Sequence, residues 1–147
     1  MKLKILYPII NGEITGGNII ALRIIDEALR RGYGAVVNSP DEGKFTRLLE
    51  EKGIKVYNID TSRTFRLDSA FRLAEVIKKE GVGLIDSHAP LSGTILSRLS
   101  GWISGVPVIN HNHCPEFINL NPIIGSLQSA LLRITCRLFC GLIIAVS

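Results

Sequence analysis

Residues 67–88, LDSAFRLAEVIKKEGVGLIDSH, contain in one stretch the pattern from which the fold follows. Apolar side chains recur there at helical spacing, at Leu67, Ala70, Phe71, Ala74 and Ile77. Gly81 then stands where the helix should stop, because glycine accepts a left-handed backbone without a Cβ clash. A short apolar strand follows and ends in polar residues. The stretch predicts a helix, a glycine stop and a strand, with chemically useful side chains just after the strand.

The same junction recurs along the whole chain. Glycines follow five predicted helices, at Gly32, Gly53, Gly81, Gly105 and Gly141. The predicted strands are residues 4–9, 35–38, 55–59, 84–87, 108–110 and 142–146. The predicted helices are residues 18–31, 67–79, 91–103 and 122–140, together with one that begins at Pro40 and ends near Gly53. Ser39 to Glu42 offer a capping box for that helix, with proline at its first position.

Strands that alternate with helices predict a parallel sheet built from strand–helix–strand units. Six apolar strands indicate an α/β, doubly wound, Rossmann-like sheet in the order 3-2-1-4-5-6. In the helix at residues 122–140, Leu127, Leu131, Ile134 and Leu138 form the apolar stripe expected to face the core. Ligands of such sheets bind beyond the carboxyl ends of the strands, so the residues there are the candidate site.

Composition narrows the class of protein. The 147 residues are 46% hydrophobic and 20% charged, with a net charge of +4, which is typical of one globular domain. The basic residues are dispersed and form no stripe, so nucleic-acid binding is not expected. Arg133 and Arg137 lie one turn apart on the last helix. A peripheral contact with an anionic membrane surface therefore stays open beside the simpler interpretation of a core-packing helix.

The cysteines and the apolar segments of the sequence favour a cytoplasmic location for the protein. Three cysteines form no evident disulfide framework. The first apolar run is too short for a signal peptide, and residues 127–146 contain two arginines and a glycine. We expect a cytoplasmic protein, with peripheral attachment at the inner membrane face left open.

The segment NGEITGGN, residues 11–18, follows the first strand and opens the first helix. Gly16 and Gly17 allow close backbone approach, and the helix N-terminus favours an anion such as a diphosphate. Asn18 joins them as a candidate ligand contact; the alternative is a tight loop that binds nothing. The segment lacks G-x-G-x-x-G, and no acid ends the second strand, so NAD binding is not expected.

Two histidine-bearing segments follow neighbouring strands, residues 86–90 and 110–115. We expect them to converge, with His88 and His113 able to donate hydrogen bonds or move protons. The alternative is that the histidines only satisfy loop backbone groups. Arg63 and Arg66, in the loop after the third strand, are candidates for holding an anionic acceptor, or else lie on a solvated loop.

Five residues are candidate zinc ligands by their side-chain type: His111, His113, Cys114, Cys136 and Cys140. The two later cysteines lie a helix length away from the histidine loop, and buried cysteines mostly act as small apolar side chains. We therefore expect no metal and no other cofactor.

The chain resembles the N-terminal domain of family-four glycosyltransferases, the retaining enzymes of GT-B architecture. The resemblance spans essentially the whole sequence. It rests on the double glycine, on GIKV at residues 53–56, on GLIDSH at 83–88, on GVPVINHNH at 105–113 and on IIAVS at 143–147. The chain departs from the family pattern at four positions: Gly83 replaces an aspartate, Asp86 a histidine, His111 a threonine and Cys114 a glycine.

The resemblance implies how an enzyme of this type divides its work. The N-terminal domain binds a glycan or lipid-linked acceptor, and a C-terminal domain binds the nucleotide-sugar donor. Gly16 and Gly17 would then meet the donor diphosphate and His113 the donor sugar. His88 would line the acceptor side, and Asn112 is a further candidate contact. Protein groups hold the leaving diphosphate, so no metal is required.

We expect residues 1–147 to be one acceptor-side domain whose donor domain is absent, since no helix follows the last predicted strand. Such a chain should lack turnover alone and gain it from a partner that supplies the second half. The exposed last strand leaves self-association open. Two alternatives remain. One is a non-catalytic sugar-, acceptor- or partner-binding module of the same fold, and the other is an unrelated nucleotide-binding enzyme such as a sugar-nucleotide epimerase or reductase.

Overall fold

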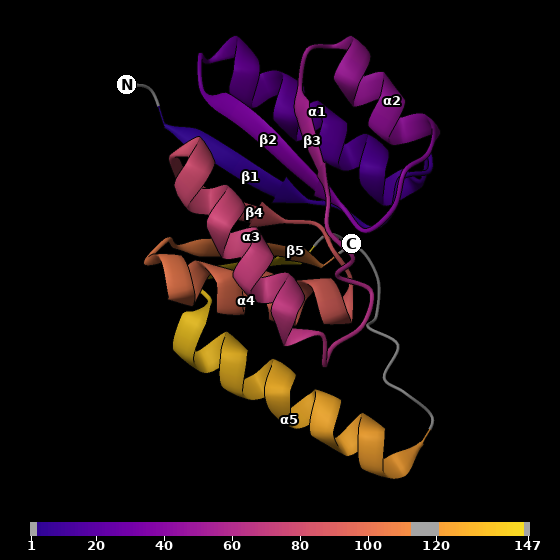
Figure 1. Ribbon diagram of the computed structural model, residues 1–147, viewed down its shortest axis with the longest axis vertical. Coiled ribbons are helices and arrows are strands. Elements are labelled where there is room, and N and C mark those ends of the chain that lie inside the picture. The colour runs from indigo at the N-terminus through magenta and orange to yellow at the C-terminus, as the bar shows by residue number, and fades with distance from the viewer. Residues whose placement is uncertain (1–2, 113–120, 146–147) are drawn as a thin grey trace.

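The computed structural model describes residues 3–112 and 121–145, which form a six-stranded parallel sheet flanked by helices (Figure 1). The strands are β1 (Lys4–Pro8), β2 (Gly34–Ser39), β3 (Lys55–Asn58), β4 (Val82–Ser87), β5 (Val108–Asn112) and β6 (Leu142–Ala145). The helices are α1 (Gly16–Arg30), α2 (Lys44–Glu51), α3 (Leu67–Glu80), α4 (Leu91–Ser104) and α5 (Pro122–Phe139). The sheet order β3-β2-β1-β4-β5-β6 confirms the predicted Rossmann-like topology.

Alternate residues of the central strand β1 serve two cores, one on each face of the sheet. Ile5 and Tyr7 pack with α1 and α2, while Leu6 lies in a second core with α3. Figure 1 shows α1 and α2 on one side of the sheet and α3, α4 and α5 on the other. A parallel sheet covered in this way directs the carboxyl ends of β1 and β4 toward one edge, where loops can form a site.

Four of the five predicted glycine stops adopt the left-handed backbone: Gly32, Gly53, Gly81 and Gly105, with φ between 65° and 84°. Gly141 does not, and Cys140 before it has an extended backbone with φ of −100° and ψ of 122°. The chain therefore leaves α5 directly into the turn before β6. The prediction of a fifth glycine stop was wrong.

The predicted start of the second helix was also wrong. Pro40 to Gly43 form a turn, and α2 begins at Lys44. The Ser39 hydroxyl donates to the Asp41 carbonyl at 2.6 Å and caps no helix. The Gly12 carbonyl, from the loop after β1, accepts from the Phe45 amide at 2.7 Å. A loop distant in sequence thus supplies the acceptor that the capping box was expected to provide.

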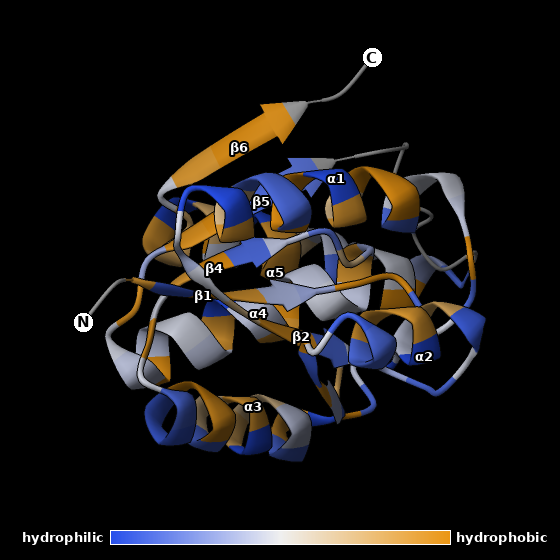
Figure 2. Ribbon diagram, turned by 90° about the horizontal axis from the view of Figure 1, so that it is seen from above, coloured by the Kyte–Doolittle hydropathy of each residue, from blue (hydrophilic) through white to orange (hydrophobic). Residues whose placement is uncertain are grey.

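The apolar stripe predicted for the last helix does not face the core. Leu127, Ile134 and Leu138 are all at least half exposed, and the buried positions of α5 are Gly125 and Thr135. Thr135 lies where α5 meets Arg98 of α4, so the buried face of α5 makes a polar contact with α4. No helix in the described part of the chain is long and apolar enough to cross a membrane. At the edge of the sheet, Figure 2 shows β6 as a hydrophobic strand.

Glu80, the last residue of α3, ties that helix to two strands at the amino end of the sheet. Its carboxylate accepts from Lys55 Nζ at 2.6 Å, from the Tyr57 hydroxyl at 2.6 Å and from Lys4 Nζ at 3.1 Å. These three hydrogen bonds lower the pKa of Glu80 from 4.5 to about 2.

Because the pKa of Glu80 is lower in the folded state, its contribution to stability is complete above pH 4.5 and disappears as the pH falls toward 2. We expect Glu80→Gln to lower the free energy of unfolding by about 1 kcal/mol at pH 7. The difference from the parent chain should shrink between pH 5 and pH 2. Urea denaturation across this range measures it, with Glu75→Gln, an exposed residue of α3, as the control. A difference that does not change with pH contradicts the assignment.

Candidate functional site

The strand order reverses between β1 and β4, and a crevice opens at the carboxyl ends of these two strands. A cavity of about 280 Å³ lies there. Its walls are the end of β1, the loops after β2 and β3, the start of α4 and one side chain of α5. The lining residues are Ile9, Ile10, Pro40, Thr61, Ser62, Pro90, Leu91, Ser92, Gly93 and Gln128. A crevice at this topological position is where open α/β sheets bind their ligands.

A second cavity of about 410 Å³ adjoins the first and shares Ser62, Ser92 and Gln128 with it. The Thr64 and Ser92 hydroxyls lie 2.7 Å apart, and Gln128 Nε2 donates to Thr64 at 3.2 Å. These groups join the β3–α3 loop to α4 and α5. Hydroxyl and amide groups among apolar walls suit a neutral, hydroxyl-bearing ligand.

Arg63 and Arg66 line the second cavity, which is the place expected for acceptor-binding residues. The guanidinium of Arg66 is already paired, 2.9 Å from Asp68 and 3.2 Å from Asp60. An anionic ligand would have to compete with these carboxylates. Arg63 is exposed and is the better placed of the two for such a contact.

The glycine loop after β1 is held together by Asn18. The Asn18 side chain is fully buried, and its amide donates to the carbonyls of Asn11 at 2.8 Å and Glu13 at 2.7 Å. The Thr15 hydroxyl caps α1 by accepting a hydrogen bond from the backbone N–H of Asn18 at 3.2 Å. Asn18 therefore shapes the loop from inside, and the ligand contact expected of its side chain stays a prediction.

Gly16 opens α1 at the surface, and no contact among the described residues requires a glycine there. Its φ lies outside the left-handed region, and a Cβ built on it meets no described atom within 4 Å. In the middle of a helix a glycine is less stable than alanine by roughly 0.5–1 kcal/mol, which is an upper limit for the first residue of α1. The open space is what close approach of an external group to the helix N-terminus would require. Gly17, the next residue of α1, is partly exposed beside it.

The backbone of Gly12, in the loop after β1, packs directly against the backbone of Gly43, just before α2. A Cβ on Gly12 would lie 2.6 Å from the Gly43 nitrogen, and a Cβ on Gly43 would clash with the Gly12 carbonyl. The Gly12 amide also donates to the Asp41 carboxylate. The glycine loop is thereby fixed to the turn that precedes α2.

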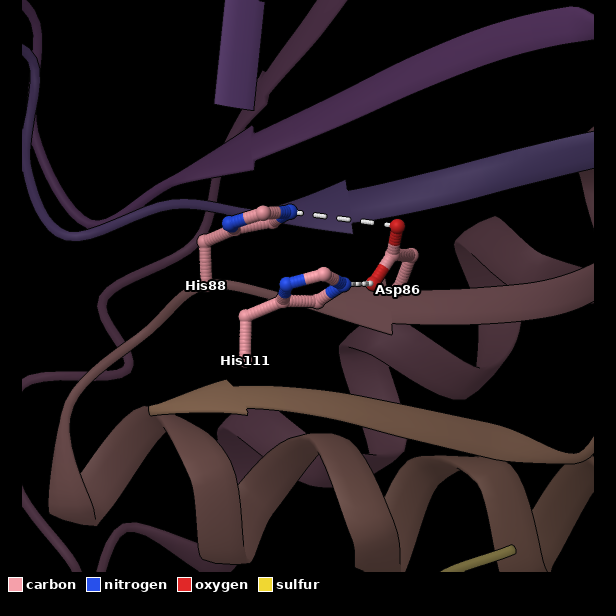
Figure 3. A group of neighbouring side chains, drawn as sticks. All are labelled: Asp86, His88 and His111. Atoms are coloured by element: carbon pink, nitrogen blue, oxygen red, sulfur yellow. Dashed lines mark ion pairs between the residues drawn. The ribbon is translucent and has the colours of Figure 1, made fainter. Parts of the chain in front are cut away.

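Asp86, His88 and His111 form a polar cluster where β4 and β5 end (Figure 3). His111 Nε2 lies 3.0 Å from Asp86 Oδ1, and His88 Nε2 lies 3.8 Å from Asp86 Oδ2. The two imidazoles stack with centroids 4.4 Å apart and planes inclined by 14°. The predicted convergence of the two histidine segments is thus confirmed for His88 and His111. The His88 side chain is fully buried, so it lies beneath the surface and does not line the cavity.

The carboxylate of Asp86 stays ionised although it is buried. Burial by itself raises its pKa, but the contacts with His111 and His88 outweigh that effect and lower the pKa to about 2. Burial and the charge of Asp86 together raise the pKa of the neighbouring Tyr7 hydroxyl. The cluster therefore carries a fixed negative charge facing two imidazoles.

The same three side chains are the group that a metal ion could use, since one donor atom from each lies within 4.8 Å of the others. Imidazole binds a metal in the plane of its ring, and stacked rings direct their nitrogens along nearly parallel lines. The arrangement therefore suits a carboxylate that orients two imidazoles better than it suits coordination. Of the five residues considered for zinc, only His111 belongs to this group, while His113 and Cys114 lie outside the described residues.

Two contacts escaped the sequence reasoning. The contact between Asp86 and His111 was not predicted. Two-residue alternation places positions 86 and 88 on the same side of the chain, and this was a signal that Asp86 would lie near the converging histidines. Arg98 of α4 is buried and donates to Asn110 Oδ1 at 2.9 Å, and no local signal marks this contact. His113 lies outside the described residues, as does the side chain of Asn112, so their expected roles stay predictions.

Comparison with solved structures shows where this fold occurs. The chain superposes on HepE of Anabaena in complex with UDP, with a TM-score of 0.74 and 20% identity, over 99% of this chain and 38% of that one. MurG of Acinetobacter baumannii matches with a TM-score of 0.70 and 17% identity, over 99% and 41% of the two chains. A UDP-N-acetylglucosamine 2-epimerase matches with a TM-score of 0.66 and 16% identity, over 99% and 42%.

At these identities the likeness shows the fold alone, a Rossmann-like sheet that each of these longer proteins contains. The chain spans less than half the length of the solved proteins it matches. No protein-family model matches the chain, and no curated protein does.

Proposed function

We propose that this chain is the acceptor-side half of a GT-B glycosyltransferase, which transfers a sugar from a nucleotide-sugar to a glycan or lipid-linked acceptor. The observation that carries the proposal is the crevice between the ends of β1 and β4, with the open N-terminus of α1 beside it. Solved structures of the same fold include HepE in complex with UDP-glucose. Further polypeptide, as in those longer chains, would complete the enzyme.

The two parts of the site suit the two substrates. The N-terminus of α1, with an unobstructed glycine at its first position, suits the donor diphosphate, because helix N-termini attract anions. The joined cavities, with the hydroxyls of Ser62, Ser92 and Thr64 on their walls, suit a hydroxyl-bearing acceptor. His113 remains the proposed catalytic residue at the donor sugar, and Asn112 remains a proposed contact of the donor diphosphate or substrate. Backbone and side-chain groups are proposed to hold the diphosphate without a metal.

Calorimetric titration tests the proposal, using UDP, GDP and their sugars on the chain alone and mixed with a separately expressed donor domain. Nucleotide binding and sugar transfer by the mixture, but not by the chain alone, support a half-enzyme. Binding of a glycan acceptor without transfer by the mixture favours a non-catalytic binding module. Tight nucleotide binding by the chain alone would overturn the acceptor-side assignment.

A sugar-nucleotide epimerase is the second candidate, because the fold also matches the solved 2-epimerase. The mixture is incubated with UDP-N-acetylglucosamine and no acceptor, and the sugar nucleotide is followed by NMR. Formation of an epimer assigns the chain to that reaction. An unchanged sugar nucleotide, together with transfer when an acceptor is added, assigns it to glycosyl transfer.

Gly16→Ala isolates the contribution of the glycine loop. The added methyl group meets none of the described atoms of the chain, so stability should stay the same or rise by up to about 1 kcal/mol. A diphosphate approaching the helix N-terminus would meet that methyl group. Affinity for the nucleotide-sugar should fall about tenfold, equivalent to about 1.4 kcal/mol. Calorimetry on the mixture measures this, with Lys44→Ala, at the first position of α2, as the control; equal affinity of Gly16→Ala and parent would contradict the assignment.

A further inference from the structure

Asp86 is unusual among the acidic residues of the chain, because its buried carboxylate has no lysine or arginine at ion-pair distance within the described residues. Its contacts at that distance are His111 and His88. The pairing of β4 with β5 produces this arrangement: Ser87 lies beside Asn110, so the next residues, His88 and His111, are neighbours across the two strands. The alternation of strand residues then places Asp86 and His88 on the same face of β4.

An ionised carboxylate can only accept hydrogen bonds. A ring nitrogen that faces it at hydrogen-bonding distance must therefore carry the proton. In His111 that nitrogen is Nε2, 3.0 Å from the carboxylate. In His88, Nε2 lies 3.8 Å away, which is beyond hydrogen-bonding distance, so the carboxylate does not fix the tautomer of His88. A neutral imidazole has one N–H, so Nδ1 of His111 is then an acceptor.

We infer that Asp86 is a positioning residue, whose carboxylate holds His111 as the Nε2-protonated tautomer, with the ring of His88 stacked on it. Figure 3 shows both Nε2 atoms directed toward Asp86 and both Nδ1 atoms on the opposite side of the rings. Asp86 thus determines which ring nitrogen of His111 donates and which accepts at the end of β5.

The location of the two rings connects this role to ligand binding. His88 stands two residues before Pro90, where the cavity wall begins, and its backbone amide donates to the Pro8 carbonyl of β1 at 2.8 Å. His111 is the next-to-last residue of β5. A change in the tautomer of His111 would break contacts beneath the crevice, so Asp86 acts on the ligand through His111 and the ring of His88 stacked on it. This part of the inference rests on the proposed function.

The tautomers are measured on the 147-residue chain by ¹⁵N NMR of the histidine rings, at a pH where the imidazoles are neutral, with His88→Gln and His111→Gln used for assignment. We expect the His111 ring to be protonated at Nε2. In Asp86→Asn, His111 should shift substantially toward the Nδ1-protonated form. Asp68→Asn, at an exposed residue in the first turn of α3, is the matched control and should leave the spectrum unchanged.

Two results would overturn the inference: an Nδ1-protonated His111 ring in the parent chain, or a His111 ring spectrum that Asp86→Asn does not alter. If Asp86→Asn does not fold, His88→Gln replaces it. That variant keeps both Asp86 and His111, so His111 must remain Nε2-protonated, and a switch to Nδ1 counts against the inference. Zinc-dependent stabilisation that Asp86→Asn abolishes would also overturn it, because the cluster would then be a metal site.

Ligand affinity is measured in an experiment separate from the NMR of the histidine tautomers. In the mixture with the donor domain, Asp86→Asn should weaken nucleotide-sugar affinity by about tenfold, by analogy with the carboxylates that orient metal-binding histidines. If the parent mixture binds no nucleotide-sugar, the proposed function fails, while the NMR result still decides the role of Asp86. If the parent binds and Asp86→Asn binds equally well, the link from Asp86 to the ligand is refuted.

Discussion

Arg98→Ala should lower the free energy of unfolding by about 3 kcal/mol. The guanidinium is 2% exposed and joins three elements. It donates from α4 to Asn110 Oδ1 of β5 at 2.9 Å and to the Leu132 carbonyl of α5 at 3.1 Å. Alanine would leave a cavity and remove the charged donor from both acceptors. Asn110 Oδ1 would keep the weak Cys140 Sγ donor at 3.4 Å, and the Leu132 carbonyl would keep the Thr135 hydroxyl at 3.3 Å. A hydrogen bond to a charged group contributes about 1.5–3 kcal/mol.

Urea denaturation followed by circular dichroism measures this loss. Arg98→Lys should be intermediate, because one ammonium cannot reproduce the planar fork that reaches both acceptors. Arg137→Ala, at an exposed position near the end of α5, should stay within about 0.5 kcal/mol of the parent. A loss below about 1 kcal/mol for Arg98→Ala would show that Arg98 does not anchor α5 to the sheet.

Gly12→Ala should destabilise the chain by about 2–3 kcal/mol. Its Cβ would lie 2.6 Å from the carbonyl carbon of Glu42 and from the Gly43 nitrogen, and these are backbone atoms that cannot rotate away. The loop after β1 and the turn before α2 would have to separate. The bond from the Phe45 amide to the Gly12 carbonyl, 2.7 Å in the parent, would then lengthen or break.

Gly16→Ala is the matched control for this result, since it adds the same methyl group to the same loop in open space. Stability should fall only for Gly12→Ala, and hydrogen exchange at the Phe45 amide should accelerate only in that variant. If Gly12→Ala is as stable as the parent, the two backbones do not approach as closely as described.

The sheet order was predictable because the signals for it are local. A helical period followed by a glycine stop repeats along the chain, and four of the five glycines have the left-handed backbone that this interpretation requires. Once strands and helices alternate, the handedness of their connections leaves few topologies open. The position of the crevice follows from the same argument.

The errors arose where contacts distant in sequence decide the outcome. The periodicity of α5 identifies an apolar stripe but not the face that meets the protein, and the buried face contains Thr135, which accepts a hydrogen bond from Arg98 of α4. The start of α2 depends on the Gly12 carbonyl, more than thirty positions earlier. Neither partner can be found by inspecting the helix itself.

The histidine cluster could be predicted from the sequence only in part. The sequence predicted that the ends of two strands meet, but it did not predict that Asp86 and His111 lie 3.0 Å apart. At both positions the residue differs from the family pattern that the chain resembles, and the two differing residues are in contact. Two substitutions that look independent in the sequence can therefore be coupled in the structure.

The position of β1 in the sheet has a consequence for synthesis on the ribosome. This strand emerges early, yet its two neighbours are β2, at Gly34–Ser39, and β4, at Val82–Ser87. One edge of β1 can pair soon, while the other must wait until more than forty further residues have been made. During that interval the nascent chain exposes an apolar strand with an open edge, the kind of surface that chaperones cover and that aggregates when left bare. Translation speed between β2 and β4 is therefore expected to influence the yield of folded protein.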